Sequence, residues 1–247
     1  MDFVEASNID LQKEASHWWI KTRFQYIDLA LAKFKGKDIS VLEIGCGTAQ
    51  NLAFLRNESR YKDQITKVVG VDLNLPKNFS RPDLQSCDKL LNSLEDLEGS
   101  EKYNLIIMLD LIEHLDDPVK LLKEYKKYLV DDGVLLILVP SFQSLWSQHD
   151  IALGHVKRYT LAILNNETQS AGFRRIREGY LFSVFFPIVF ILRKFFRDNS
   201  GNHAESDLKL PNPVINFLCY FLGIVERKFG NILPFGTSAF GIYEQDQ

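Results

Sequence analysis

The sequence predicts an α/β fold in which a mostly parallel sheet carries helices on both faces. The first observation is a continuous apolar run at residues 39–44, followed by a two-glycine turn and then by helical spacing. The second is that similar runs recur at 67–72 and 103–110, separated by helical segments. Strands that alternate with helices imply parallel order, as in the nucleotide-binding α/β folds.

Length, composition and charge limit the possible functions. The 247 residues, 46% of them hydrophobic and 25% charged, suit one large domain or one domain with an insertion. A net charge of −3 gives no general attraction to nucleic acid, so we expect no nucleic-acid partner. Cys46, Cys87 and Cys219 form no CxxC pair, which favours a reducing compartment and argues against a structural zinc site. Because no apolar signal segment opens the chain, we expect a cytoplasmic protein.

The N-terminal half supplies the first elements. An apolar stripe over residues 11–33 predicts a cap helix ahead of the sheet, and we treat residues 1–35 as an N-terminal unit. The strands at 39–44 and 67–72 follow. No third strand can be placed in the segment 76–88, which has mixed polarity and contains two prolines.

The middle of the chain continues the alternation. A strand at 103–110 precedes a helix that opens at Asp116-Asp117-Pro118 and ends near Leu129, because aspartate and proline favour the first helical turn. Asp131-Asp132-Gly133 then predicts a turn into a further strand at 134–140.

A helix at 160–171 and strands at 173–180 and 238–243 complete a predicted sheet of seven strands, the last of them antiparallel. We therefore assign residues 36–180 and 237–247 to the sheet domain. Residues 181–236 are then a hydrophobic helical insertion between the sixth and seventh strands.

The insertion contains two apolar runs of about twelve residues each, shorter than the ~20 residues that span a bilayer. Arg193, Lys194 and Arg197 follow the first run. Such segments fit a helical pair at 181–230 that lies in a membrane interface or covers an oily substrate. A private lid or a contact between subunits explains the same pattern equally well, so the oligomeric state stays open.

Three carboxylates, Glu43, Asp72 and Asp110, stand at the ends of three predicted strands. In an open parallel sheet, ligands bind beyond the carboxyl ends of the strands. Asp72 lies 27 residues after Gly45, and a carboxylate at this place can accept both hydroxyls of a ribose. Gly45 and Gly47 allow a ligand to approach the main chain. We therefore expect a nucleoside at this edge.

The glycine turn also separates the candidate nucleotide ligands. Gly47-Thr48-Ala49-Gln50 lacks the lysine of a phosphate-binding P-loop, and Gln50 breaks the dinucleotide fingerprint GxGxxG. Glu43 would repel a pyrophosphate and favour a cationic or ammonium-bearing ligand. A nicotinamide-dependent oxidoreductase is therefore disfavoured.

Four blocks, at residues 41–49, 69–72, 109–115 and 132–135, resemble in this order the motifs of class I S-adenosylmethionine-dependent methyltransferases. The resemblance implies their Rossmann-like fold and S-adenosylmethionine as the cofactor. The cofactor-binding residues that it implies are Glu43, Gly45, Cys46, Gly47, Asp72, Leu73, Ser93, Leu94 and Asp110.

The resemblance also implies a role for each part of this set. Asp72 would hold the ribose, Leu73 would pack on the adenine, and Asp110 would lie near the methionine end. The sequence departs from the family pattern at Ala49, Asn92-Ser93 and Tyr103-Asn104.

Candidates for acceptor chemistry lie after the strand at 134–140. Together with His17-Trp18-Trp19, this block resembles a subgroup of these methyltransferases associated with cell-envelope or lipid-linked glycan pathways. We hypothesise that His149 or His155 is the general base and that Arg158, beside Tyr159, binds an anionic acceptor group. Each histidine fits a loop-ordering role equally well. Neither a metal nor a covalent intermediate is required.

The function that this sequence predicts is methyl transfer to oxygen or nitrogen on a small-molecule or lipid-linked acceptor. A nucleic-acid methyltransferase of base amines would show an Asn/Asp-Pro-Pro-aromatic turn where this chain has Asp110-Leu111-Ile112-Glu113. The remaining alternative is a non-catalytic binding or scaffold protein that keeps the fold.

Overall fold

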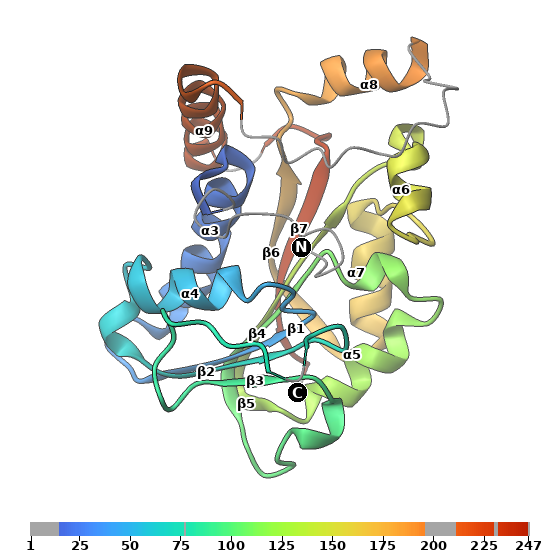
Figure 1. The fold of residues 1–247 in the computed structure, drawn as a ribbon. Coiled ribbons are helices and arrows are strands. Elements are labelled where there is room, and N and C mark those ends of the chain that lie inside the picture. Colours follow the sequence, from blue (N-terminus) through green and yellow to red (C-terminus); the bar gives the residue numbers. More distant parts are fainter. Residues whose placement is uncertain (1–14, 77, 196–210, 230–231, 247) are drawn as a thin grey trace.

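The computed structural model describes residues 15–76, 78–195, 211–229 and 232–246. Its centre is a seven-stranded sheet in the order β3-β2-β1-β4-β5-β7-β6 (Figure 1). Neighbouring strands from β3 to β5 pair in parallel, whereas β7 is antiparallel to both β5 and β6. The predicted fold class is confirmed, including the antiparallel last strand.

The strand bounds differ from the predicted ones in two places. The third strand is only three residues long and half-buried, so it lacks the apolar run by which the other strands are recognised. The turn predicted at 131–133 is wrong, because the fifth strand already begins at Leu129 and Gly133 lies within it. Tyr103 pairs with Leu129 and Leu105 with Val134, so residues 130–133 bulge out of register. The strands are β1 (Ile39–Ile44), β2 (Ile65–Val71), β3 (Lys89–Leu91), β4 (Tyr103–Leu109), β5 (Leu129–Pro140), β6 (Phe173–Leu181) and β7 (Ser238–Gln245).

Helices cover both faces of the sheet, and each face has its own hydrophobic core. Alternate residues of β1, β4 and β5 point to opposite faces, so Val41 and Leu105 join one core while Leu42 and Ile106 join the other. The helices are α3 (Trp18–Leu31), α4 (Gln50–Asn57), α5 (Pro118–Lys126), α6 (Gln148–Ala152), α7 (Leu161–Ser170), α8 (Phe186–Phe195) and α9 (Pro213–Lys228). Side chains of α3 and α4 fill the first core and those of α5 and α7 the second.

The N-terminal helix α3 begins at Trp18, and residues 11–14 of the predicted helix lie outside the described residues. His17 caps it, because its Nδ1 accepts a hydrogen bond from the Trp19 amide at 3.2 Å. α3 ends at Leu31, close to the predicted boundary.

Helices α8 and α9 lie in the chain between β6 and β7, and α9 packs beside α3 (Figure 1). At this crossing a Cβ on Gly223 would come within 2.7 Å of Thr22 Oγ1, so the close approach requires a glycine. The Glu226 carboxylate accepts hydrogen bonds from the amides of Phe182 and Ser183, each at 2.8 Å. α9 is therefore anchored to both α3 and the end of β6. Among the described helices, none has the length and apolarity to cross a membrane.

Candidate active site

Neighbouring strands bring the three predicted carboxylates to one edge of the sheet. β2, β1 and β4 lie side by side, and Glu43, Asp72 and Asp110 stand at or just beyond their carboxyl ends. A parallel sheet places these ends along the same edge. The sequence-based expectation of a shared acidic edge therefore has its structural basis in the strand order.

The turn after β1 is held by Asp72. Gly45 and Gly47 have φ of +75° and +49°, in the left-handed region that favours glycine. One carboxylate oxygen of Asp72 accepts the Gly47 amide at 2.8 Å, and the other accepts the Asn74 amide at 2.8 Å. Each oxygen keeps a further lone pair, so Asp72 can order the turn and still accept ligand hydroxyls. We call Glu43, Gly45, Gly47 and Asp72 the glycine-turn site.

Glu43 is the buried acid of the glycine-turn site. Its Oε1 accepts a hydrogen bond from Asn51 Nδ2 at 2.5 Å, whereas Oε2 has no partner. Burial raises the pKa of Glu43 to about 7, against the opposing effects of Asn51 and Arg23. An orphaned buried carboxylate oxygen fits a cationic ligand group, such as the ammonium of S-adenosylmethionine.

The other residues predicted for the cofactor differ in their exposure. Leu73 is 70% exposed directly after Asp72, as expected of an apolar side chain that covers a ligand. Ser93 caps the 3-10 turn Leu94–Asp96 by accepting the Glu95 amide at 3.1 Å, and Leu94 is half-buried. Both follow β3, the strand next to β2. Cys46 is buried, and burial raises the pKa of its thiol well above the usual range, so it is a packing residue rather than a nucleophile.

Asp110 is paired with an arginine that the sequence analysis missed. Arg23 Nη2 lies 2.9 Å from Asp110 Oδ2, and the guanidinium lies 4.3 Å from the centre of the Trp19 ring. Arg23 is only 2% exposed. The sequence did hold a signal for Arg23. It is a charged residue on the apolar stripe of the helix, four positions after Trp19, where it can contact that ring. The ion pair joins α3 to the end of β4.

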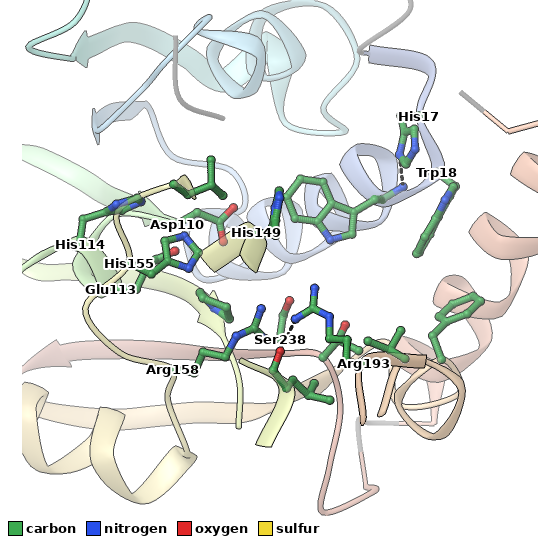
Figure 2. Close-up of a pocket in the computed structure, with 17 residues that line it drawn as sticks. His17, Trp18, Asp110, Glu113, His114, His149, His155, Arg158, Arg193 and Ser238 are labelled. Atoms are coloured by element: carbon green, nitrogen blue, oxygen red, sulfur yellow. Dashed lines mark hydrogen bonds between the residues drawn. The ribbon is translucent and has the colours of Figure 1, made fainter. Parts of the chain in front are cut away.

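A pocket of about 340 Å³ lies between α3 and α8, next to Asp110 (Figure 2). Asp110, Glu113, His114 and His155 gather on one side of it, while Trp18 and Arg193 stand farther along (Figure 2). We call it the α3–α8 pocket. It is lined by His17, Trp18, Trp19, Asp110, Glu113, His114, Pro140, Leu145, His149, Leu153, His155, Arg158, Phe185, Val189, Arg193, Thr237 and Ser238.

Of the four predicted catalytic residues, three line this pocket: His149, His155 and Arg158. Tyr159 does not. It is fully buried, and its hydroxyl donates to the Ile112 carbonyl at 3.2 Å. Burial raises the pKa of this phenol, so its surroundings assign Tyr159 to the core.

Asp150, at the start of α6, orders the pocket residues around it. Its Oδ1 lies 2.9 Å from His155 Nδ1 and accepts Arg158 Nε at 2.6 Å, while Oδ2 accepts the Ser147 amide at 2.8 Å. Burial would raise the pKa of Asp150, but the hydrogen bonds from His155 and Arg158 outweigh it and hold the pKa well below the usual range. Arg158 is thus already engaged by a carboxylate, and His155 is held by its Nδ1.

Glu113 is a second pocket acid for which the sequence analysis assigned no role. It is fully buried, and neither carboxylate oxygen has a hydrogen-bond partner. Burial and the nearby charge of Asp110 raise the pKa of Glu113 well above its usual range. Burying a charged carboxylate without a partner is unfavourable, so we expect a ligand to bind at this position.

A family model described as a methyltransferase domain matches residues 18–178, more than half of the chain. The chain therefore belongs to this methyltransferase-domain family. The glycine-turn site meets the chemical demands of S-adenosylmethionine, with an orphaned acid, a left-handed turn and a carboxylate beside it.

Individual relatives are distant. The chain is 29% identical over 107 residues to the mitochondrial ubiquinone biosynthesis O-methyltransferase of Candida albicans, which covers 40% of this chain and 32% of that protein. The matched part is thus about a third of that relative's length.

The solved structures that match share the fold. The N-methyltransferase NodS of Bradyrhizobium japonicum WM9, in complex with S-adenosyl-L-homocysteine, is 12% identical with a TM-score of 0.51, covering 92% of this chain and 88% of that one. Coclaurine N-methyltransferase is 13% identical with a TM-score of 0.54, covering 90% and 70%. At these identities the likeness concerns the fold alone.

Proposed function

We propose that this methyltransferase modifies an oxygen or nitrogen atom of a small-molecule or lipid-linked acceptor bound in the α3–α8 pocket. The observation that carries the proposal is Asp110, which stands at the strand edge next to the glycine-turn site and also lines the pocket. The pocket therefore opens where the methionine end of the cofactor is expected. S-adenosylmethionine supplies a methyl group on a positively charged sulfur.

The cofactor proposal keeps the whole predicted set: Glu43, Gly45, Cys46, Gly47, Asp72, Leu73, Ser93, Leu94 and Asp110. Glu43 Oε2 accepts the ammonium, because it is the orphaned oxygen in a buried position. Asp72 accepts the ribose hydroxyls, and exposed Leu73 covers the adenine. Cys46 contributes its main chain and its small size to the turn around the cofactor. Its thiol takes no part in the chemistry, because burial raises its pKa.

Two histidines are candidates for the general base. His155 has its Nδ1 committed to Asp150, so its Nε2 is the atom available to take a proton from an acceptor hydroxyl or ammonium. His149 lines the same pocket and is half-buried. Arg158 remains a candidate for an anionic acceptor group, with its charge shared with Asp150. The curated relative's name records O-methylation, which favours an oxygen acceptor.

We propose a lipid-linked acceptor, and the subgroup associated with cell-envelope or lipid-linked glycan pathways, on the basis of helices α8 and α9. Phe185, just before α8, and Val189 within it line the pocket. The outer faces of both helices are apolar and exposed, at Ile188, Ile191, Leu192, Val214, Ile215, Phe217, Leu218 and Phe221. Such a surface fits a cytoplasmic protein whose insertion touches a membrane interface.

The acceptor proposal is tested by incubating the purified protein and radiolabelled S-adenosylmethionine with the aqueous and lipid extracts of the source cells. We expect label in the lipid extract, and a loss of at least 100-fold in the His149→Ala/His155→Ala double variant. A Cys87→Ala variant serves as the control, because Cys87 is exposed and lies outside the pocket. Label confined to the aqueous extract would reject the lipid-linked acceptor.

Membrane contact is tested separately by flotation with liposomes of phosphatidylglycerol and phosphatidylethanolamine. We expect the protein to float, and Phe217→Ser/Phe221→Ser to stay at the bottom of the gradient. Absence of flotation would leave a private lid or a subunit contact as the role of the exposed face. The scaffold alternative predicts a protein that methylates nothing in either extract. Calorimetry with S-adenosylhomocysteine then shows whether such a protein binds the cofactor.

A further inference from the structure

Three potential metal ligands meet on one wall of the α3–α8 pocket. Glu113 and His114 follow β4 in a 3-10 turn, and His155 comes from the loop after α6. One ligand atom from each residue lies within 4.8 Å of the other two. Ligand atoms of a bound cation stand ~3–3.5 Å apart for bond lengths near 2.1 Å, so small side-chain rotations would close the set.

The backbone holds these side chains together although they are distant in sequence. The Val156 amide donates to the Glu113 carbonyl at 2.7 Å, and the His155 amide donates to the Asp150 carbonyl at 2.9 Å. The rings of His114 and His155 meet edge to face with their centres 4.7 Å apart (Figure 2). Backbone hydrogen bonds and the contact between the two rings thus hold the three side chains close together.

Glu113 lacks the partners that a buried acid needs. Both of its oxygens are without hydrogen-bond partners, and Arg23, whose charge acts on Glu113, is already paired with Asp110. A buried carboxylate is stable in its charged form when it is paired or coordinates a metal. A cation between Glu113 and the two histidines would satisfy it.

His155 has the support that metal-ligating histidines show. Its Nδ1 is bound to the Asp150 carboxylate at 2.9 Å, and Asp150 is in turn held by Arg158 and Ser147. A carboxylate on one ring nitrogen fixes the tautomer and turns the other nitrogen toward a metal. Since Asp150 is fully buried, these hydrogen bonds are shielded from water.

We propose that Glu113, His114 and His155 bind one divalent transition-metal ion on the wall of the α3–α8 pocket. Two imidazole nitrogens and one carboxylate suit Zn²⁺, Co²⁺, Fe²⁺ or Mn²⁺ and disfavour Mg²⁺ and Ca²⁺, which take oxygen ligands. Three protein ligands leave coordination positions open toward the pocket.

The use of such an ion rests on the proposed function. An ion open to the pocket would hold the acceptor through an oxygen atom and lower the pKa of that hydroxyl. The substrate class is then a hydroxyl compound, which selects oxygen over nitrogen as the methylated atom. His155 becomes a ligand, and His149 remains as the group that takes the proton.

The test is metal binding by the full-length, untagged protein after treatment with a chelator. Titration with Co²⁺, followed by visible absorption, and calorimetry with Zn²⁺ should each show one site. The Glu113→Gln and His155→Gln variants should weaken binding by at least 100-fold. His149→Ala is the matched control, a pocket histidine outside the cluster, and should bind Co²⁺ like the wild type.

S-adenosylhomocysteine binding, measured on the same samples, separates the two proposals. Wild-type protein that binds S-adenosylhomocysteine but takes up no Co²⁺ would overturn the metal site and leave the methyltransferase proposal standing. Unchanged Co²⁺ binding in both variants would also overturn it. Wild-type protein that does not bind S-adenosylhomocysteine would instead reject the proposed function. If Glu113→Gln fails to fold, His155→Gln alone carries this test.

Discussion

The glycine-turn site and the α3–α8 pocket are built in different ways. The first is made by β1, β2 and the short turns that follow them, with contacts such as that between the Gly47 amide and Asp72. The second draws its walls from places as distant in the chain as His17 and Ser238. A site made of local turns can be recognised from contiguous sequence motifs. A site made of distant segments depends on how those segments pack.

The comparison predicts that the pocket depends on long-range ion pairs for its stability. Arg23→Met should lower the free energy of unfolding by about 3 kcal/mol, because it leaves the charge of Asp110 beside Glu113 without its partner. Urea denaturation measures this change. Lys37→Met removes an exposed ion pair with Asp132 and should cost less than about 1 kcal/mol. Equal effects of the two substitutions would show that the buried pair is not special.

The glycine-turn site should respond in affinity. Asp72→Ala should weaken S-adenosylhomocysteine binding about 100-fold, or ~2.7 kcal/mol, because it removes both the proposed ribose acceptor and the group that holds the Gly47 amide. Calorimetry measures the dissociation constant. Asp132→Asn, at the other end of the sheet, is the control and should leave the affinity unchanged.

Glu43 should make cofactor affinity depend on pH. Burial raises its pKa to about 7, with Asn51, Arg23 and Asp72 around it, so the carboxylate gains its charge as the pH rises through 7. If the ammonium of S-adenosylhomocysteine binds the charged form, as proposed, the affinity should increase about tenfold from pH 6 to pH 8. Calorimetry at several pH values measures this, and Glu43→Gln should flatten the profile. A flat wild-type profile would separate Glu43 from the ammonium.

The smallest effect is expected at Leu73. Leu73→Ala should weaken S-adenosylhomocysteine binding about fivefold, or ~1 kcal/mol, by removing the proposed apolar contact with the adenine. Thermal unfolding of the unliganded protein should stay the same, because the side chain is 70% exposed. Ile176→Ala on β6 removes an exposed apolar side chain away from the site and should leave the affinity for S-adenosylhomocysteine unchanged.

The sequence by itself determined the strand-turn-helix units of the first half and the acidic residues that end their strands. Apolar runs, glycine turns and helix caps act over a few residues, so β1, β4 and the turn at Gly45 could be predicted from local pattern alone. The strand β3 could not be predicted, because its three half-buried residues show no such pattern. Its position is set by its pairing with β2.

Only the tertiary structure decided which polar groups meet. Arg23 pairs with Asp110 across 87 positions, and Glu113 meets His155 because the Val156 amide donates to the Glu113 carbonyl. It also assigned Arg158 to Asp150 and Tyr159 to the core. The physical reason is that desolvation and charge pairing depend on distance in space, and a single sequence does not state which distant side chains become neighbours.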